Sequence, residues 1–156
     1  MQWTILRPVA FFENLVPGFY GNVFATSFKL ALKGRPLQMV ATDDIGHFAA
    51  EAFLHPEAYA GRGLSLAGDE LTYDQFVEIF EYLAEREIPW TYWPICSLFL
   101  AMFKDMGSMF QWFHDEGYRA DIQELRRIHP GLMDFGKWLE EKSEFVNDYK
   151  GGKVNL

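Results

Sequence analysis

The sequence predicts an α/β fold in which a short, incomplete parallel sheet is followed by a mostly helical C-terminal part. A strand-like segment begins within the first few residues and is apolar on both faces, as in parallel sheets covered by helices. Strand-like and helix-like patterns then alternate along residues 37–86, and only helical patterns follow Pro89. With 156 residues, 49% of them hydrophobic, the chain is long enough for one domain with a sizeable core.

The first predicted strand covers residues 3–6 and ends at Pro8, since proline cannot donate a hydrogen bond to a sheet. Such a strand needs neighbours on both sides, and the remaining sequence offers few candidates. An open sheet edge that recruits another strand is therefore expected. Residues 9–14 follow the carboxyl end of this strand, the edge at which open α/β sheets bind ligands.

A second strand is predicted over residues 37–41, followed by a helix that Thr42 caps and His55-Pro56 ends. Asp43 and Asp44 stand in its first turn, where the helix dipole favours acids, so catalytic paired carboxylates are not needed to explain them. The apolar positions of this helix fall on one stripe: Ile45, Phe48, Ala49, Ala52 and Phe53.

A third strand is predicted over residues 63–67, before a turn at Gly68-Asp69. Thr72 and Gln75 have the spacing of a capping box that opens a further helix. The apolar stripe of this helix comprises Tyr73, Phe76, Val77, Phe80, Leu83 and Ala84. The pattern predicts a helix over about residues 73–84.

The region beyond Pro89 is expected to form four helical pieces rich in large side chains. Their apolar positions are Ile95, Leu98, Phe99, Met102, Phe103 and Met106, then Met109, Phe110 and Phe113, then Ile122, Leu125 and Ile128, and finally Phe135, Trp138 and Leu139. We expect residues 1–142 to form the domain and the charged, glycine-containing residues 143–156 to form a flexible tail.

Composition excludes several classes of function. The net charge of −8 and the pI near 4.9 argue against a nucleic-acid surface. The longest apolar stretch, about residues 95–103, falls short of the roughly 20 residues that span a bilayer. No signal peptide is recognisable, so a cytoplasmic or nuclear location is expected. Cys96 is the single cysteine, which excludes an internal disulfide, and it is predicted to be a structural thiol.

The four histidines do not predict a metal site. His114, Asp115 and Glu116 are consecutive, and consecutive side chains of a helix diverge. The other three, His47, His55 and His129, have no partner at i+4 that would complete a metal site. Solvated or capping histidines are the better interpretation.

Three sequence blocks carry a resemblance to a known family. They are WTILRP at residues 3–8 with FFEN at 11–14, ATDDIG at 41–46, and LAGDELT at 66–72. In order and spacing they resemble the NmrA-like family of atypical short-chain dehydrogenases, and the similarity extends to about residue 141. The resemblance implies the C-terminal half of a Rossmann-type fold with a mostly helical lobe. Members of this family bind NADP(H) or NAD(H) as redox sensors, transcriptional regulators or reductases.

The chain departs from the family pattern at the glycine-rich phosphate loop. No G-x-G-x-x-G phosphate loop occurs, so the chain alone is expected to bind NADP(H) weakly or not at all. Whether Met1 is the true start or reflects a truncated gene model stays open. Tyr149 and Lys153 have the Tyr-x-x-x-Lys spacing of short-chain dehydrogenases, but Gly151 and Gly152 lie between them, so we interpret the match as coincidence and predict no catalytic residue. The resemblance agrees with this, since NmrA-like regulators generally lack that catalytic tyrosine.

The nicotinamide side of the cofactor site is the part that the resemblance retains. It implies that Pro8, Val9, Ala10 and Phe11 contact the nicotinamide carboxamide through main-chain groups, with Asn14 lining the adjacent pocket. The residues alone allow a second interpretation, in which Phe11, Phe12 and Leu15 only pack the end of the strand against the following helix and Asn14 is a cap.

Three functions therefore stay open. The first is an NAD(P)(H)-linked regulator that acts by protein association, through the open sheet edge or the aromatic C-terminal helices, with a protein partner or a second copy. The second is an NADP-dependent reductase, which requires an upstream Rossmann half and a proton donor. The third is a truncated paralogue without cofactor chemistry. The C-terminal aromatic residues support association, since they exceed what one helical stripe buries, with core packing as the alternative.

Overall fold

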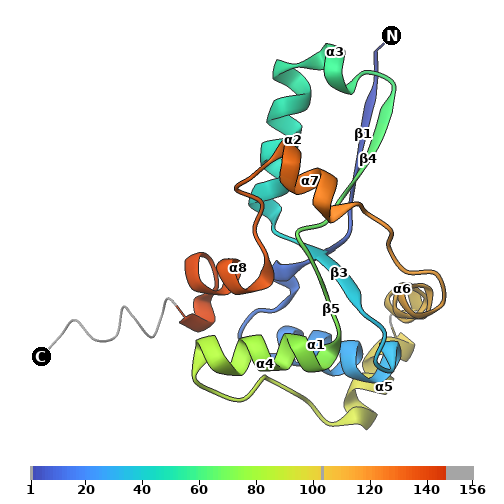
Figure 1. The fold of residues 1–156 in the computed structure, drawn as a ribbon. Helices are drawn as coiled ribbons and strands as arrows, with labels where there is room; N and C mark the ends of the chain where they lie inside the picture. Colours follow the sequence, from blue (N-terminus) through green and yellow to red (C-terminus); the bar gives the residue numbers. More distant parts are fainter. Residues whose placement is uncertain (1, 103, 147–156) are drawn as a thin grey trace, which may run out of the picture.

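The structure, a computed structural model, describes residues 2–102 and 104–146 and has an α/β architecture (Figure 1). Its strands are β1 (Thr4–Pro8), β2 (Ala10–Phe11), β3 (Leu37–Val40), β4 (Arg62–Leu66) and β5 (Asp69–Leu71). Its helices are the 3-10 helix η1 (Phe12–Asn14), α1 (Phe19–Leu32), α2 (Thr42–Leu54), α3 (Pro56–Tyr59), α4 (Tyr73–Ala84), α5 (Trp93–Met102), α6 (Lys104–Asp115), α7 (Ile122–Ile128) and α8 (Phe135–Glu141).

The strands form two small sheets that adjoin end to end. β1 pairs with β4 in parallel, and β3 pairs in parallel with β2 and antiparallel with β5. Two hydrogen bonds join the sheets, because Val9 N–H donates to the Leu66 carbonyl at 3.1 Å and Gly68 N–H donates to the Met39 carbonyl at 2.8 Å. A Cβ atom at Gly68 would lie 2.1 Å from the Met133 carbonyl oxygen, so this crossing requires glycine.

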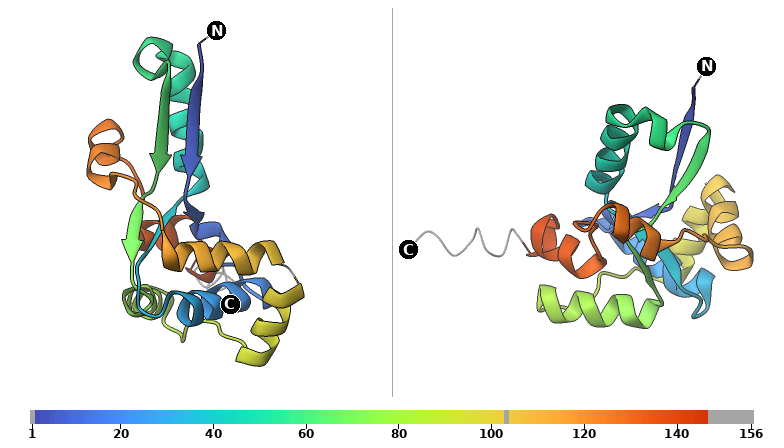
Figure 2. Two further views of the ribbon diagram at one scale, coloured as in Figure 1. Left: turned by 90° about the vertical axis from the view of Figure 1, so that its right-hand side faces the viewer. Right: turned by 45° about the horizontal axis from the view of Figure 1, so that its top comes forward.

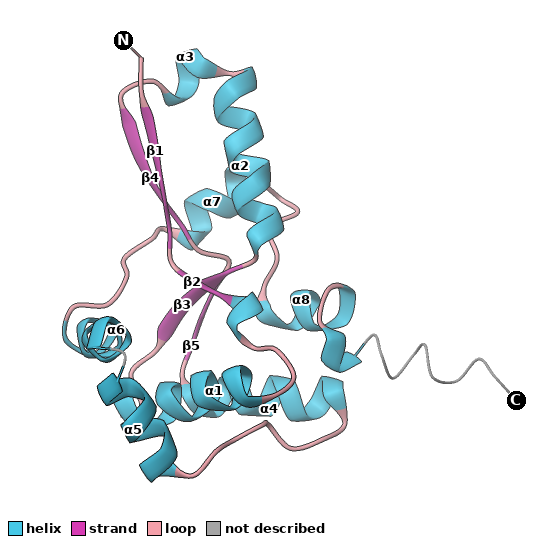
Figure 3. Cartoon of the chain, turned by 180° about the vertical axis from the view of Figure 1, so that it is seen from behind, coloured by secondary structure: helices cyan, strands magenta, loops and turns pink. Residues whose placement is uncertain are grey.

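Helices cover the sheets unevenly. α2 lies against the β1–β4 pair (Figure 2), and α1 and α4 lie beneath β3 and β5 with α8 alongside α4 (Figure 3). Among the described residues β1 pairs only with β4, and Ile5 is 44% exposed. The incomplete sheet expected at the first strand is therefore seen within the described residues, whereas the expectation that this strand is buried on both faces is wrong.

The parallel pairing expected from the sequence is confirmed, and two short strands were not predicted. Asp69 begins β5 instead of completing a turn, and it lies opposite Met39 in the antiparallel ladder. β2 and β5 have only two and three residues, which is too short for a period-two pattern to be visible. Tertiary pairing with β3 fixes both.

The predicted helices are present, with differences at α2, α5 and α6. Met106, expected on the piece that carries Ile95, lies on α6 together with Met109. The capping box of α4 is present, with Thr72 and Gln75 exchanging hydrogen bonds. Thr42 is the first residue of α2 and not its cap, which is Ala41. Phe53, expected on the buried stripe of the same helix, is 87% exposed.

The main core lies between the lower sheet, α1, α4 and α8. Its largest buried side chains are phenylalanines, including Phe12, Phe28, Phe76, Phe80 and Phe135. Phe145 and Val146 also belong to this core, although the sequence placed them in the tail. The remainder of that tail, including Tyr149 and Lys153, lies outside the described residues. Within the described ranges, no helix has the length and apolar character needed to cross a membrane.

Candidate functional site

A cavity of about 430 Å³ opens at the carboxyl end of β1. The residues lining it are Pro8, Val9, Ala10, Phe11, Asn14, Tyr20, Phe24, Met106, Met109, Phe110, Phe113 and Tyr118. The first five are the residues that the resemblance implied for cofactor binding. The structure therefore brings all five to one cavity, and their role there stays a prediction.

The sheet holds the inner wall of the cavity rigidly. Val9 is anchored by its hydrogen bond to Leu66, and Ala10 and Phe11 pair with β3. η1 then turns the chain, so that Asn14 faces the same cavity while Phe12 enters the core. The Val9 N–H is already used in its hydrogen bond to Leu66, so it is not available to a ligand. The side-chain amide of Asn14 is a polar group that this wall offers instead.

The packing interpretation is also partly correct. Phe12 and Leu15 are fully buried in the core, as that interpretation expects. Asn14 is the last residue of η1 and does not cap that helix. Packing and cavity lining are thus divided between neighbouring residues of one short segment.

The outer wall comes from α1, α6 and the segment after α6. Phe110 lies between Phe24 and Phe113, with ring centroids 6.5 Å and 5.5 Å away. Met106 and Met109 add flexible thioether side chains that can adapt to a ligand. Predominantly apolar walls with a few polar groups are typical of sites for small organic ligands.

Tyr118 places a phenol on this wall. Its ring packs against Phe113 and Trp112, at centroid distances of 5.2 Å and 5.1 Å. Partial burial of Tyr118 disfavours the charged phenolate and raises its pKa above the ordinary value. Its phenol is therefore neutral at pH 7.

Glu13 is a key residue of this region that the sequence analysis missed. Its Oε1 accepts hydrogen bonds from the Thr42 N–H and hydroxyl, both at 2.9 Å, and from the Trp138 indole N–H at 3.2 Å. Glu13 therefore ties η1 to the start of α2 and to α8. The two segments that Glu13 connects, FFEN at residues 11–14 and ATDD at residues 41–44, were both recognised in the sequence. The sequence alone does not show that they contact each other.

A second cluster missed by the sequence analysis lies at α2. Asp44 is buried and accepts a hydrogen bond from the Met133 N–H at 3.0 Å. Its other oxygen lies 3.2 Å from Nε2 of His129, whose ring stacks on His47 at 3.7 Å. These residues are too distant in sequence for spacing to reveal the contact. They connect α2 to the segment between α7 and α8.

The remaining candidate ligands do not converge. Within residues 2–102 and 104–146, no group of three or more His, Cys, Asp or Glu side chains is arranged to hold a metal. His114 does contact its neighbour Asp115, with 2.9 Å between Nδ1 and Oδ1, contrary to the expected divergence. Cys96 is fully buried and lies 3.1 Å from the Ser27 hydroxyl, as a structural thiol should.

Comparison with protein families gives a match over nearly the whole described chain. The model of the NmrA-like family matches residues 4–139. This chain belongs to the NmrA-like family. No curated protein matches it at a significant level.

Solved structures show the same fold. A nucleoside-diphosphate-sugar epimerase from Staphylococcus aureus has a TM-score of 0.65 at 15% identity, over 90% of this chain and 53% of its own. A mutant of NmrA has a TM-score of 0.61 at 14% identity, over 99% of this chain and 56% of its own. NmrA, a negative transcriptional regulator, in complex with NAD has a TM-score of 0.58 at 12% identity, with the same coverage.

These similarities confirm the predicted Rossmann-type fold with its helical lobe. The chain spans little more than half of the length of the structures that it matches. NmrA has also been solved in complex with NADP.

Proposed function

We propose that this chain is an NAD(P)(H)-linked regulatory protein of the redox-sensing type that acts by associating with another protein and not by turnover. In this proposal, the cavity at the end of β1 receives the nicotinamide side of the cofactor. The observation that supports it is the convergence of Pro8, Val9, Ala10, Phe11 and Asn14 on one cavity in a chain of the NmrA-like family. We expect the protein in the cytoplasm or nucleus.

The residues present fit the nicotinamide end of the cofactor. The apolar walls suit a flat ring, and Asn14 offers both a donor and an acceptor to a carboxamide. When bound, the cofactor would supply hydride chemistry. The phosphate end fits less well, since the sequence contains no G-x-G-x-x-G loop to hold a pyrophosphate. We therefore expect weak binding by this chain alone.

The raised pKa of Tyr118 supports the proposal of regulation without turnover. A catalytic tyrosine in a dehydrogenase needs a lowered pKa, which a neighbouring cation provides. Burial instead raises the pKa of Tyr118, and no lysine or arginine is among the described residues that line the cavity.

The reductase is the second candidate, and the presence of a phenol in the cavity favours it. If the chain were a reductase, Tyr118 would be its proton donor, and Tyr118→Phe would abolish NADPH oxidation while leaving NADPH binding intact.

A fluorescence titration with NADPH tests the proposal. Trp112, which packs on Tyr118, should transfer excitation energy to the bound dihydronicotinamide. We expect saturation only at high NADPH concentration, about fivefold weaker binding for Asn14→Ala, and unchanged binding for the control Asn22→Ala. NADPH oxidation in the presence of candidate carbonyl substrates, lost in Tyr118→Phe, would contradict the proposal and favour the reductase.

A further inference from the structure

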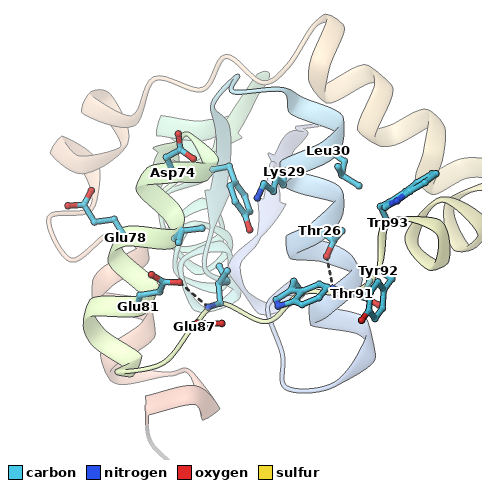
Figure 4. A pocket seen from close by; sticks show the side chains of 14 residues that line it. Thr26, Lys29, Leu30, Asp74, Glu78, Glu81, Glu87, Thr91, Tyr92 and Trp93 are labelled. Carbon is cyan, nitrogen blue, oxygen red and sulfur yellow. Dashed lines mark hydrogen bonds between the residues drawn. The ribbon is translucent and has the colours of Figure 1, made fainter.

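A second and larger cavity lies away from β1, between α1, α4 and the segment that joins α4 to α5 (Figure 4). It has a volume of about 820 Å³. We call it the acidic groove, and its lining residues are Thr26, Lys29, Leu30, Tyr73, Asp74, Val77, Glu78, Glu81, Glu87, Ile88, Trp90, Thr91, Tyr92 and Trp93. It shares no lining residue with the candidate cofactor cavity.

The groove is held open by fixed contacts. The Thr91 N–H donates to the Thr26 hydroxyl at 2.9 Å, which attaches the connecting segment to α1. The Ile88 N–H donates to Oε1 of Glu81 at 3.4 Å, which attaches it to α4, and the Ile88 side chain is buried. Pro89 further restricts this backbone. A preformed groove binds a partner with a smaller ordering cost.

Large aromatic side chains stand exposed along one side of the groove. Trp90, Tyr92 and Trp93 are 56%, 67% and 67% exposed. The rings of Trp90 and Tyr92 meet edge to face at 5.3 Å, which leaves ring surface accessible. Tryptophan and tyrosine dominate the binding energy of protein interfaces, and their faces attract cations.

The charges of the lining are predominantly negative. Asp74, Glu78, Glu81 and Glu87 oppose the single cation Lys29. In Figure 4 the Glu81 carboxylate faces the groove, whereas that of Glu78 lies on the outer side of α4. The whole chain carries a formal charge of −8, which adds a long-range attraction for basic partners.

The groove already accommodates one cation of its own. Nζ of Lys29 lies 5.4 Å from the centre of the Tyr73 ring. This internal cation–π contact shows that an aromatic face in the groove is accessible to a positively charged group.

We propose that the acidic groove binds an arginine-bearing segment of a partner protein. The planar guanidinium can stack on an indole face while it donates hydrogen bonds to a carboxylate, which an ammonium cannot do equally well. The groove exceeds the volume of a single side chain, which favours a peptide over a small free cation. The inference deepens the proposed role in protein association and is independent of the cofactor cavity.

Calorimetric titration of the full chain with an end-capped peptide of alternating alanine and arginine tests the proposal. We expect saturable binding that weakens with added salt. The double variant Glu81→Gln/Glu87→Gln keeps the acceptor for Ile88 and should bind roughly fivefold more weakly, as should Trp93→Ala. The control Glu140→Gln/Glu144→Gln makes the same change in charge on exposed residues outside the groove and should leave binding unchanged.

Three outcomes would overturn the proposal. The first is an absence of peptide binding. The second is an equal loss of peptide affinity in the groove and control double variants, which would indicate non-specific attraction. The third is binding of spermine as tight as that of the peptide. A failure of the NADPH titration would not affect this result, so the two proposals can fail separately.

Discussion

Glu13 connects parts of the chain that are distant in sequence. One carboxylate oxygen receives hydrogen bonds from Thr42 and Trp138, whereas Oε2 is buried without a partner among the described residues. Since a buried donor left without an acceptor costs free energy, removal of this side chain should affect three elements together.

We predict that Glu13→Ala lowers the free energy of unfolding by about 1–2 kcal/mol, because the part-buried Trp138 indole N–H loses its acceptor, whereas the exposed Thr42 donors can bond to water. Glu13→Gln, which keeps one acceptor oxygen, should lose about half as much. Urea denaturation measures both. Glu140→Ala, at an exposed site, is the control, and a Glu13→Ala variant as stable as this control would refute the role of Glu13 as a connector.

Tyr118 predicts a dependence of stability on alkaline pH. Burial raises its pKa above the ordinary value of 10.0. The unfolded chain then releases this proton first, so the contribution of the neutral phenol is complete below pH 10 and is lost as pH rises through the folded-state pKa. Burial also raises the pKa of Tyr59 and of Tyr73. Ultraviolet titration of phenolate should therefore show a late-ionising phase whose amplitude falls by one tyrosine in Tyr118→Phe. An unchanged late phase in that variant would contradict the assignment.

At the scale of elements, Asp44 attaches α2 to the segment between α7 and α8. We predict that Asp44→Ala lowers the free energy of unfolding by about 3 kcal/mol, because the Met133 N–H loses its buried acceptor. Lys142→Ala removes the neighbouring but exposed ion pair with Asp43 and should change the free energy of unfolding much less, because solvent screens this pair. Thermal unfolding compares the two, and similar losses would show that burial is not the deciding factor.

Elements with sequence signals inside one segment could be predicted, whereas short elements that depend on pairing with a distant segment could not. α4 was predicted with its capping box, because Thr72 and Gln75 act within one helical turn. β5 was not predicted, since its pairing depends on β3, some thirty residues earlier. The start of α2 is a similar case. Thr42 was expected to cap this helix by accepting a hydrogen bond, but Glu13 of η1, which is distant in sequence, accepts a hydrogen bond from the Thr42 N–H instead.

The candidate site was predicted in part. The resemblance gave the five residues of its inner wall, from Pro8 to Asn14, and these residues are adjacent in sequence. The outer wall of Met106, Met109, Phe110 and Tyr118 was not assigned to any site, because helical spacing shows which face is apolar and not which cavity that face lines. Tertiary packing of α6 over the end of β1 creates the cavity.

At the scale of the whole molecule, the chain is similar to about half of a Rossmann-type protein, and the cavity at β1 differs in chemistry from the acidic groove. The cavity at β1 is predominantly apolar, with the Asn14 amide and the Tyr118 phenol among its polar groups, and the acidic groove is aromatic and negatively charged. Because the two cavities share no lining residue, the two proposed ligands would not compete for the same side chains.

The most direct test of the cofactor cavity is methyl NMR of the chain labelled at its methionine ε-methyl groups. Met106 and Met109 line the cavity, whereas Met39 is buried in the sheet and Met133 packs beside the main core. On titration with NADPH we predict saturable shifts of Met106 and Met109, with Met39 and Met133 unchanged. Reduced nicotinamide mononucleotide should produce the same shifts at similar concentrations, because the sequence contains no phosphate loop. An absence of shifts with both ligands, or shifts of Met133 alone, would contradict the assignment of this cavity to the nicotinamide.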